Sequence, residues 1–138
     1  MRDDNCIFCK LANGDIPTNS IYEDEDFRVI LDASPATRGH ALILPKQHYA
    51  NLYEIEDETL AKAAKLAKKV INHEKEVLGC DGYNVVQNNG EAAGQTVFHF
   101  HMHLIPRYSE DSRPMLTFAE TSISDEEMDA LCDKIKRA

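Results

Sequence analysis

The apolar residues of this chain fall mostly into short runs broken by turn residues, a pattern that predicts β-strands. Acidic residues, Pro and Gly separate the first three runs from one another. Two later runs flank the polar loop Asn88 to Thr96, which indicates a hairpin with a wide loop. The expected strands are Ser20 to Glu23, Phe27 to Asp32, His40 to Leu44, Tyr83 to Gln87 and Val97 to Pro106.

Helical spacing of apolar residues marks two further segments. The longer one runs from Asp57 to Leu78 and ends at Gly79, which predicts one long helix. Its expected buried stripe consists of Leu60, Ala64, Ala67, Val70, Ile71, Val77 and Leu78. A short helix is expected from Ile7 to Asn13, ahead of Gly14.

The last part of the sequence carries the start signal of a C-terminal helix. Ser124 and Glu127 have the spacing of a capping box, and an apolar stripe follows at Met128, Leu131 and Ile135. Strands and helices in this order, without regular β-α-β alternation, predict an α+β fold with an antiparallel sheet of about five strands. The chain contains no repeat or linker-like stretch, so we expect a single domain over residues 1–138.

Charge and hydropathy narrow the possible partners. The formal net charge is -9 at pH 7 and no basic stripe is present, which argues against a nucleic acid polymer as partner. No apolar run reaches the roughly 18 residues that a membrane span needs, and the N-terminus lacks signal-peptide features. We therefore expect a cytoplasmic protein with no membrane partner. A small phosphorylated ligand fits the acidic surface only where local donors and dipoles hold it.

The stretch His99 to Ile105 is the most informative part of the sequence, because histidine alternates there with large apolar residues. Successive side chains of a strand point to opposite faces, so His99, His101 and His103 are expected to share one face. The opposite set, expected in the core, is Phe98, Phe100, Met102 and Leu104.

Three interpretations of this run are possible. An isolated histidine is usually a satisfied core or surface residue, but three on one strand face argue against that. One metal held by all three rings is awkward, since the outer Cα atoms would lie about 13 Å apart and metal–nitrogen bonds are about 2 Å long. The interpretation we favour makes the middle ring, His101, a nucleophile whose neighbours orient it or hold other groups.

The loop ahead of the histidines supplies candidate phosphate contacts. Gly90 and Gly94 allow backbone amides to turn inward. Neutral side-chain donors are present at Asn88, Gln95 and Thr96. Such donors can hold phosphate oxygens beside an attacking imidazole without a net positive patch, so the position of this loop favours a phosphate site.

Two of the four cysteines, Cys6 and Cys9, form a C-x-x-C pair, whereas Cys80 and Cys132 stand alone. Disulfides are not expected in a reducing compartment, so the pair is either a redox pair or half of a metal site. The redox interpretation lacks the expected β-α-β setting. The two lone cysteines are interpreted as small buried hydrophobes.

Taken together, these residues resemble the histidine triad (HIT) family of nucleotide hydrolases and transferases. The family signature, His-φ-His-φ-His-φ-φ with φ apolar, is matched by His99 to Ile105. The resemblance also covers Cys6 to Asn13, Phe27 to Pro35, Gly39 to His48 and Asn88 to Tyr108, in the expected order.

The resemblance implies cleavage at the α-phosphate of a nucleoside phosphoramidate or a dinucleoside polyphosphate. His101 would form a nucleotidyl-histidine intermediate that water then cleaves, with His103 and His40 as orienting and proton-relay groups. Asp32 would accept a ribose hydroxyl. The other implied substrate contacts are Asn88, Gly94, Gln95 and Thr96 at the phosphate, and Ile7, Phe8, Leu11 and Ile30 around the base.

Members of the family with an N-terminal C-x-x-C bind a structural zinc, and the matching ligands here are Cys6, Cys9, His48 and His99. Two thiolates and two imidazoles would fill a tetrahedral site and leave no open position for catalysis. The resemblance also implies a homodimer. One departure leaves the leaving group open, amine or nucleotide: the small phosphoramidase branch usually ends in a Trp-containing segment at the partner's active site, and this chain has no Trp.

Two rival functions remain compatible with the residues. One is a zinc hydrolase in which two triad histidines hold an open-site metal that activates water. Removal of the metal with a chelator would distinguish the two, because only the zinc hydrolase needs the metal for its chemistry. The other is a non-catalytic module that binds nucleotides for recognition only, and binding without turnover would indicate it.

Overall fold

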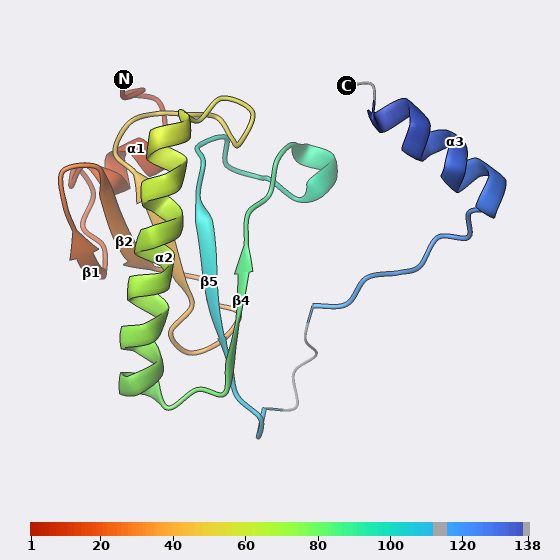
Figure 1. Cartoon of the computed structure of the whole chain (residues 1–138). Helices are drawn as coiled ribbons and strands as arrows, with labels where there is room; N and C mark the ends of the chain where they lie inside the picture. Colours follow the sequence, from red (N-terminus) through yellow and green to blue (C-terminus); the bar gives the residue numbers. More distant parts are fainter. Residues whose placement is uncertain (112–115, 137–138) are drawn as a thin grey trace.

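The computed structural model describes residues 1–111 and 116–136, and within them five strands form one antiparallel sheet (Figure 1). The strands are β1 (Ser20–Glu23), β2 (Phe27–Leu31), β3 (Ala41–Pro45), β4 (Gly82–Val86) and β5 (Met102–Arg107). Their order across the sheet is β1-β2-β3-β5-β4, so β1 and β4 are the edge strands. The α+β fold and the hairpin formed by the last two strands are confirmed.

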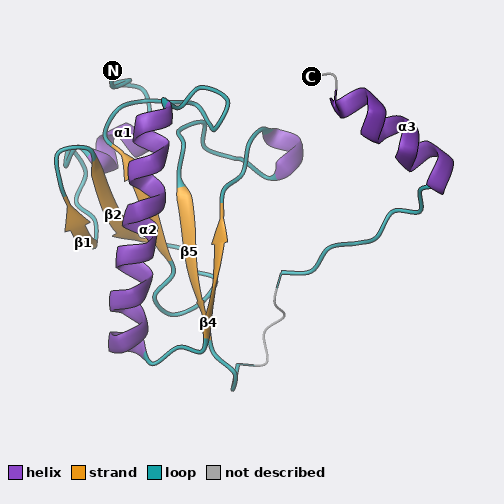
Figure 2. Ribbon diagram, viewed as in Figure 1, coloured by secondary structure: helices purple, strands orange, loops and turns teal. Residues whose placement is uncertain are grey.

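The helices are α1 (Ile7–Ala12), α2 (Asp57–Leu78) and α3 (Asp125–Lys136), and the short 3-10 helix η1 (Glu91–Ala93) lies in the loop before β5. Figure 2 shows α2 lying along one face of the sheet. Among the described residues, no helix has both the length and the apolar character needed to cross a membrane.

Two hydrophobic cores lie on opposite faces of the sheet, because side chains alternate along each strand. Ala41 and Ile43 of β3 pack in the larger core, under α2. Their neighbours Leu42 and Leu44 pack in the smaller core with Ala12 of α1. The strand β3 is therefore buried on both sides and is apolar throughout.

Near the start of α2 the buried residue is Ala63, one position before Ala64, which was expected from the sequence. The buried residues are Ala63, Leu66, Ala67, Val70 and Glu74, which follow the i, i+3, i+4, i+7, i+11 spacing of one helix face. Ala64, assigned to the stripe from sequence, is exposed because it lies off that face. Val77, also assigned to the stripe, lies seven positions after Val70 and therefore on the same face, but it is exposed near the end of the helix. Gly79 ends the helix in a left-handed conformation, as expected.

The histidine run is not one regular strand, and this corrects the sequence-based expectation. β5 begins only at Met102, opposite Ile43 of β3. Two positions further along β3 is Pro45, which has no N–H for the ladder, and the N–H of Phe100 donates instead to the carbonyl of Tyr49 at 2.6 Å. Phe100, Met102 and Leu104 are buried as predicted, but Phe98, which precedes the strand, is 48% exposed.

The helix α3 begins where the capping box predicts. The N–H of Glu127 donates to Oγ of Ser124 at 3.2 Å. Every described residue of α3 is exposed, and Figure 1 shows it standing apart from the sheet. The prediction that both lone cysteines are buried is confirmed for Cys80 and wrong for Cys132, which lies on this helix.

Gly39 is the glycine with the least room for a side chain. Its φ is +95°, and a Cβ there would lie 2.5 Å from Cδ1 of Leu78 and 3.2 Å from Cγ of Pro106. We expect Gly39→Ala to lower the free energy of unfolding by roughly 1–3 kcal/mol, measured by urea denaturation. Gly82→Ala is the matched control, since nothing lies within 4 Å of its Cβ. Equal losses in the two variants would contradict this.

Candidate active site

A cavity of about 530 Å³ opens on the α1 face of the sheet. It is lined by most of the residues that the sequence suggested for catalysis and substrate binding: Phe8, Leu11, Ile30, Asp32, Asn88, Gly94, Thr96, His101 and His103. The remaining walls are Pro17, Thr18, Leu31, Ala33, Leu42 and Val97, which the sequence gave no reason to select. The cavity is therefore lined by both apolar side chains and polar groups that include two imidazoles.

The hydrogen bond of His101 fixes its tautomer. Nδ1 of His101 lies 2.7 Å from the carbonyl oxygen of His99, and a carbonyl can only accept, so Nδ1 carries the proton. In the neutral ring the lone pair is then on Nε2. Burial lowers the pKa of His101, against the raising influence of the His99 carbonyl and the Asp32 carboxylate. The edge-on ring of Phe8, 4.8 Å away, contributes to this burial.

A second chain of bonds sets the protons on His40 and His103. The backbone N–H of Ala36 donates to Nδ1 of His40 at 2.9 Å, so His40 carries its proton on Nε2. That Nε2 donates to Nδ1 of His103 at 2.9 Å and lies 3.6 Å from Oδ2 of Asp32. The Nε2–H of His103 is left as a donor. The ring of His103 stands 5.0 Å from that of His101.

The cluster is arranged to keep its rings neutral. Burial is the main cause that lowers the pKa of His103, to about 4, and the neighbouring rings of His101 and His40 lower it further. Burial also lowers the pKa of His40, opposed by the Asp32 carboxylate. Near pH 7 these imidazoles are uncharged, and a neutral imidazole is the form that can attack an electrophile.

Two of the residues suggested for substrate binding lie elsewhere. The side chain of Gln95 is 2% exposed, and its Oε1 accepts from the N–H of Gly90 at 2.9 Å. Its Nε2 donates to the carbonyls of Ala50 and Val97 at 2.7 and 3.1 Å. Gln95 thus braces the loop instead of reaching into the cavity. Ile7 is 50% exposed and does not line the cavity, because it lies on the outer side of α1.

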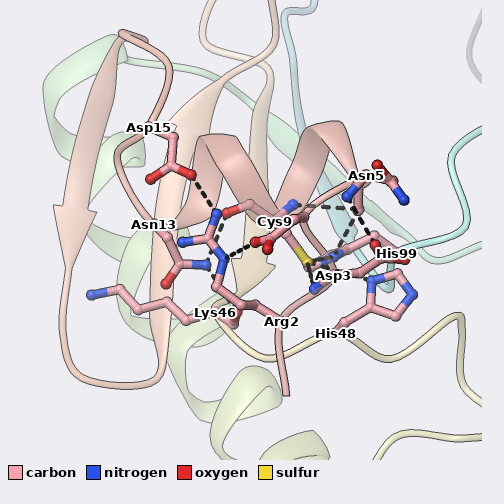
Figure 3. Close-up of polar contacts among 11 residues, drawn as sticks. Arg2, Asp3, Asn5, Cys9, Asn13, Asp15, Lys46, His48 and His99 are labelled. Carbon is pink, nitrogen blue, oxygen red and sulfur yellow. Dashed lines mark hydrogen bonds and ion pairs between the residues drawn. The ribbon is translucent and has the colours of Figure 1, made fainter.

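A cluster of two cysteines and two histidines lies between α1 and the segment before β5. Figure 3 shows three of its members, Cys9, His48 and His99. Nδ1 of His99 is 3.5 Å from Sγ of Cys6 and 3.4 Å from Sγ of Cys9, and Nδ1 of His48 is 3.4 Å from Sγ of Cys9. In a tetrahedral zinc site, bonds of about 2.3 Å to sulfur and 2.0 Å to nitrogen place S and N about 3.5 Å apart. The four ligand atoms therefore fit a tetrahedral metal.

The surroundings of the cluster orient its ligand atoms. Nε2 of His99 donates to the carbonyl of Pro45 at 2.8 Å, which turns the Nδ1 lone pair toward the sulfurs. The N–H of Asp3 donates to Sγ of Cys9 at 3.3 Å, and the N–H of Cys9 donates to Sγ of Cys6 at 3.4 Å. Burial raises the pKa of the Cys9 thiol, so a cation is needed to hold it as thiolate.

The three histidines of the run consequently have three different settings. His99 faces the cysteines, His101 presents Nε2 without a metal-ligating partner, and His103 pairs with His40. The groups that decide these settings are backbone atoms, the Pro45 carbonyl and the N–H of Ala36. No side-chain motif could have revealed them, because they come from distant parts of the chain.

Comparison with protein-family models matches residues 13–110 to the HIT domain. Adenosine 5'-monophosphoramidase hnt1 of Schizosaccharomyces pombe is 40% identical over 131 residues, which cover 95% of this chain and 96% of that relative. The chain therefore belongs to the HIT domain family, and the resemblance drawn from the histidine run is confirmed.

Solved structures of the same family superpose on this fold. SMU.412c from Streptococcus mutans UA159 is 37% identical with a TM-score of 0.90, covering 98% of this chain and 85% of that chain. Because α3 contains 12 of the 138 residues, a match over 98% of this chain includes most of that helix. A zinc-bound histidine triad family protein from Mycobacterium smegmatis is 38% identical with a TM-score of 0.75, covering 96% of each chain.

Proposed function

We propose that this protein is a nucleotide hydrolase or transferase that cleaves at the α-phosphate of a nucleoside phosphoramidate or dinucleoside polyphosphate. The observation that carries the proposal is the protonation of His101: the His99 carbonyl holds the proton on Nδ1 and leaves Nε2 as a nucleophile at the cavity. The name of the S. pombe relative, an adenosine 5'-monophosphoramidase, supports the substrate class.

The reaction has two displacements at phosphorus. In the first, Nε2 of His101 attacks the α-phosphorus, the bond to the leaving group breaks, and its electron pair departs with that group. In the second, the oxygen of water attacks phosphorus, the P–N bond breaks, its electron pair returns to the ring, and a proton is released. His103 presents its Nε2–H to the phosphate or the leaving group, and His40 holds that tautomer.

In this proposal, the phosphate, the ribose and the base of the nucleotide contact different walls of the cavity. Asn88, Gly94 and Thr96 lie on the loop side, where donors suit phosphate oxygens. The Oδ1 of Asp32 accepts from the N–H of Ser34 at 2.8 Å, which holds the carboxylate in place to accept a ribose hydroxyl. The apolar walls for the base are Phe8, Leu11 and Ile30. Gln95 acts indirectly, through the loop that it braces.

The cluster of Cys6, Cys9, His48 and His99 is proposed to hold a structural zinc. The zinc-bound relative from M. smegmatis supports this assignment. When bound, zinc would supply a cross-link between α1, the loop after β3 and the segment before β5, with no open position for a substrate. Free thiols of this kind suit a reducing compartment such as the cytoplasm. A homodimer is proposed as well, since homodimers are usual in the family.

The proposed function is tested by measuring turnover on two substrates. The zinc-loaded protein is expected to release AMP from an adenosine phosphoramidate or a diadenosine polyphosphate at a rate on the order of 1 s⁻¹ or faster, followed by chromatography. The relative rates on the two substrates identify the leaving group. Tight nucleotide binding with no turnover on either substrate would replace the proposal with a recognition module.

A second candidate has a specific observation in its favour. Ligand atoms of Asp32, His40 and His103 lie within 4.8 Å of one another, and three protein ligands with an open fourth position describe a catalytic zinc site. In that enzyme a metal-activated water would be the nucleophile. This enzyme would bind two metals per chain, and chelation would abolish its activity when the more weakly bound metal is removed. Both results would favour it over the covalent route.

A further inference from the structure

The helix α3 carries an apolar stripe that no part of its own chain covers among the described residues. Met128, Leu131, Cys132 and Ile135 follow the i, i+3, i+4, i+7 spacing of one helix face. Met128 is 53% exposed and Ile135 is 69% exposed. A helix of 12 residues is marginal by itself in water and gains its stability from a packed face.

An apolar groove of about 410 Å³ lies on the opposite side of the molecule, between β1 and the C-terminal half of α2. Its apolar walls include Ile21, Leu31, Val77 and Leu78. Val77 is 68% exposed although it belongs to the long helix that packs on the sheet. The groove therefore offers a surface of the kind that the stripe of α3 needs.

The charges of the two surfaces are complementary. The described part of α3 carries five acidic residues and two lysines, a net charge of -3: Asp125, Glu126, Glu127, Asp129, Asp133, Lys134 and Lys136. The groove is bordered by Arg38, Lys69 and His73, with Glu74 as its acidic member. Lys69 lies 4.7 Å from the ring centre of Tyr22, directly at the groove. Acidic residues concentrated in the first turn of α3 match this basic border.

The position of α3 indicates which copy supplies the helix. In Figure 1, α3 lies beyond β4, whereas the groove is on the β1 side of α2, so a chain in this conformation does not fill its own groove. β4 is an edge strand, and Val85 on it is 49% exposed. A two-fold axis beside such an edge would bring α3 of each copy over the other copy.

We propose that α3 of each chain docks, through Met128, Leu131 and Ile135, into the groove between β1 and α2 of a second copy. The exchange is reciprocal, so one dimer contains two such contacts. It covers the exposed apolar surface of both elements and places the acidic first turn of α3 against Arg38 and Lys69. This interface is independent of the proposed catalytic chemistry.

Disulfide trapping tests this contact with a cysteine that the chain already has. Cys132 lies in the stripe, so Val77→Cys in the groove is expected to form an interchain disulfide under mild oxidation, seen as a covalent dimer in a non-reducing gel. Tyr53→Cys is the matched control, because Tyr53 is 84% exposed and lies outside the groove. Cys132→Ser in the Val77→Cys background should abolish the dimer.

Mixing experiments identify which chain supplies each cysteine. A size-tagged Val77→Cys, Cys132→Ser chain mixed with the unmodified protein should give a cross-linked species of the two unlike chains. A bond between positions 77 and 132 of the same chain, or cross-linking no faster than in Tyr53→Cys, would overturn the proposal.

The oligomeric state supplies an independent measurement. Leu131→Asp is expected to raise the dimer dissociation constant at least about tenfold in analytical ultracentrifugation, because it places a charge in the apolar contact. Glu120→Gln, outside α3, is the control and should leave the constant unchanged. An unmodified protein that is monomeric at micromolar concentration would also overturn the proposal.

Discussion

Replacing His101 by alanine is expected to lower turnover at least about 10⁴-fold while leaving the fold and the bound metal in place. The variant lacks the Nε2 that attacks phosphorus, and water then has to displace the leaving group without the covalent step. The side chain of His101 contacts the His99 carbonyl but does not belong to the cysteine cluster, so zinc content should be unchanged. Steady-state rates, circular dichroism and metal analysis measure the three quantities.

His73→Ala is the matched control, since His73 is exposed on α2, away from the cavity. It should retain the activity of the unmodified protein. Rapid quenching of the unmodified enzyme with labelled substrate should also trap a nucleotidyl-protein, which His101→Ala cannot form. Activity of the His101→Ala variant within tenfold of the unmodified protein would exclude covalent catalysis at this residue.

Replacing Cys9 by serine is expected to have the largest effect on stability. Cys9 is fully buried, and its sulfur lies within 3.4 Å of Nδ1 of both His48 and His99. Loss of one ligand should release the zinc and leave buried polar groups unpaired, costing at least about 3 kcal/mol or about 10 °C in Tm. Calorimetry and metal analysis on the same samples measure both.

Cys132→Ser is the control for this change, because Cys132 is exposed on α3 and far from the cluster. Its zinc content should stay at that of the unmodified protein. A Cys9→Ser variant that keeps one zinc per chain and an unchanged Tm would remove the structural role of the cluster. A chelator should reproduce the loss of stability in the unmodified protein and have no further effect on Cys9→Ser.

His99 and His101 lie two positions apart in the chain, but their hydrogen bonds leave different ring nitrogens available. His99 uses Nε2 for the Pro45 carbonyl and so directs Nδ1 at the cysteines. His101 uses Nδ1 for the His99 carbonyl and so directs Nε2 at the cavity. A half-turn of the His99 ring would turn Nδ1 away from the cysteines, and a half-turn of the His101 ring would turn Nε2 away from the cavity. The proposed zinc, held in part by His99, would also hold in place the His99 carbonyl on which the tautomer of His101 depends.

The sequence by itself determined the elements and most of the candidate site. Short apolar runs between turn residues predicted β1 and the start of β2, and Gly79 predicted the end of α2, because local patterning and a left-handed cap act within a few residues. The spacing of the histidines singled out His101, which does line the cavity. These features depend on neighbouring positions only, and a single chain displays them.

Tertiary structure decided where each side chain points and what it can bond. The ladder between β3 and β5 ends at the pair Ile43 and Met102, so the first two histidines of the run precede β5, and Phe98 is exposed. The sequence suggested Gln95 as a phosphate contact, but in the structure its side-chain amide donates to the carbonyl of Ala50. Contacts of this kind join residues 45 or more positions apart in the chain, and a sequence pattern cannot encode which backbone group will be opposite a given side chain.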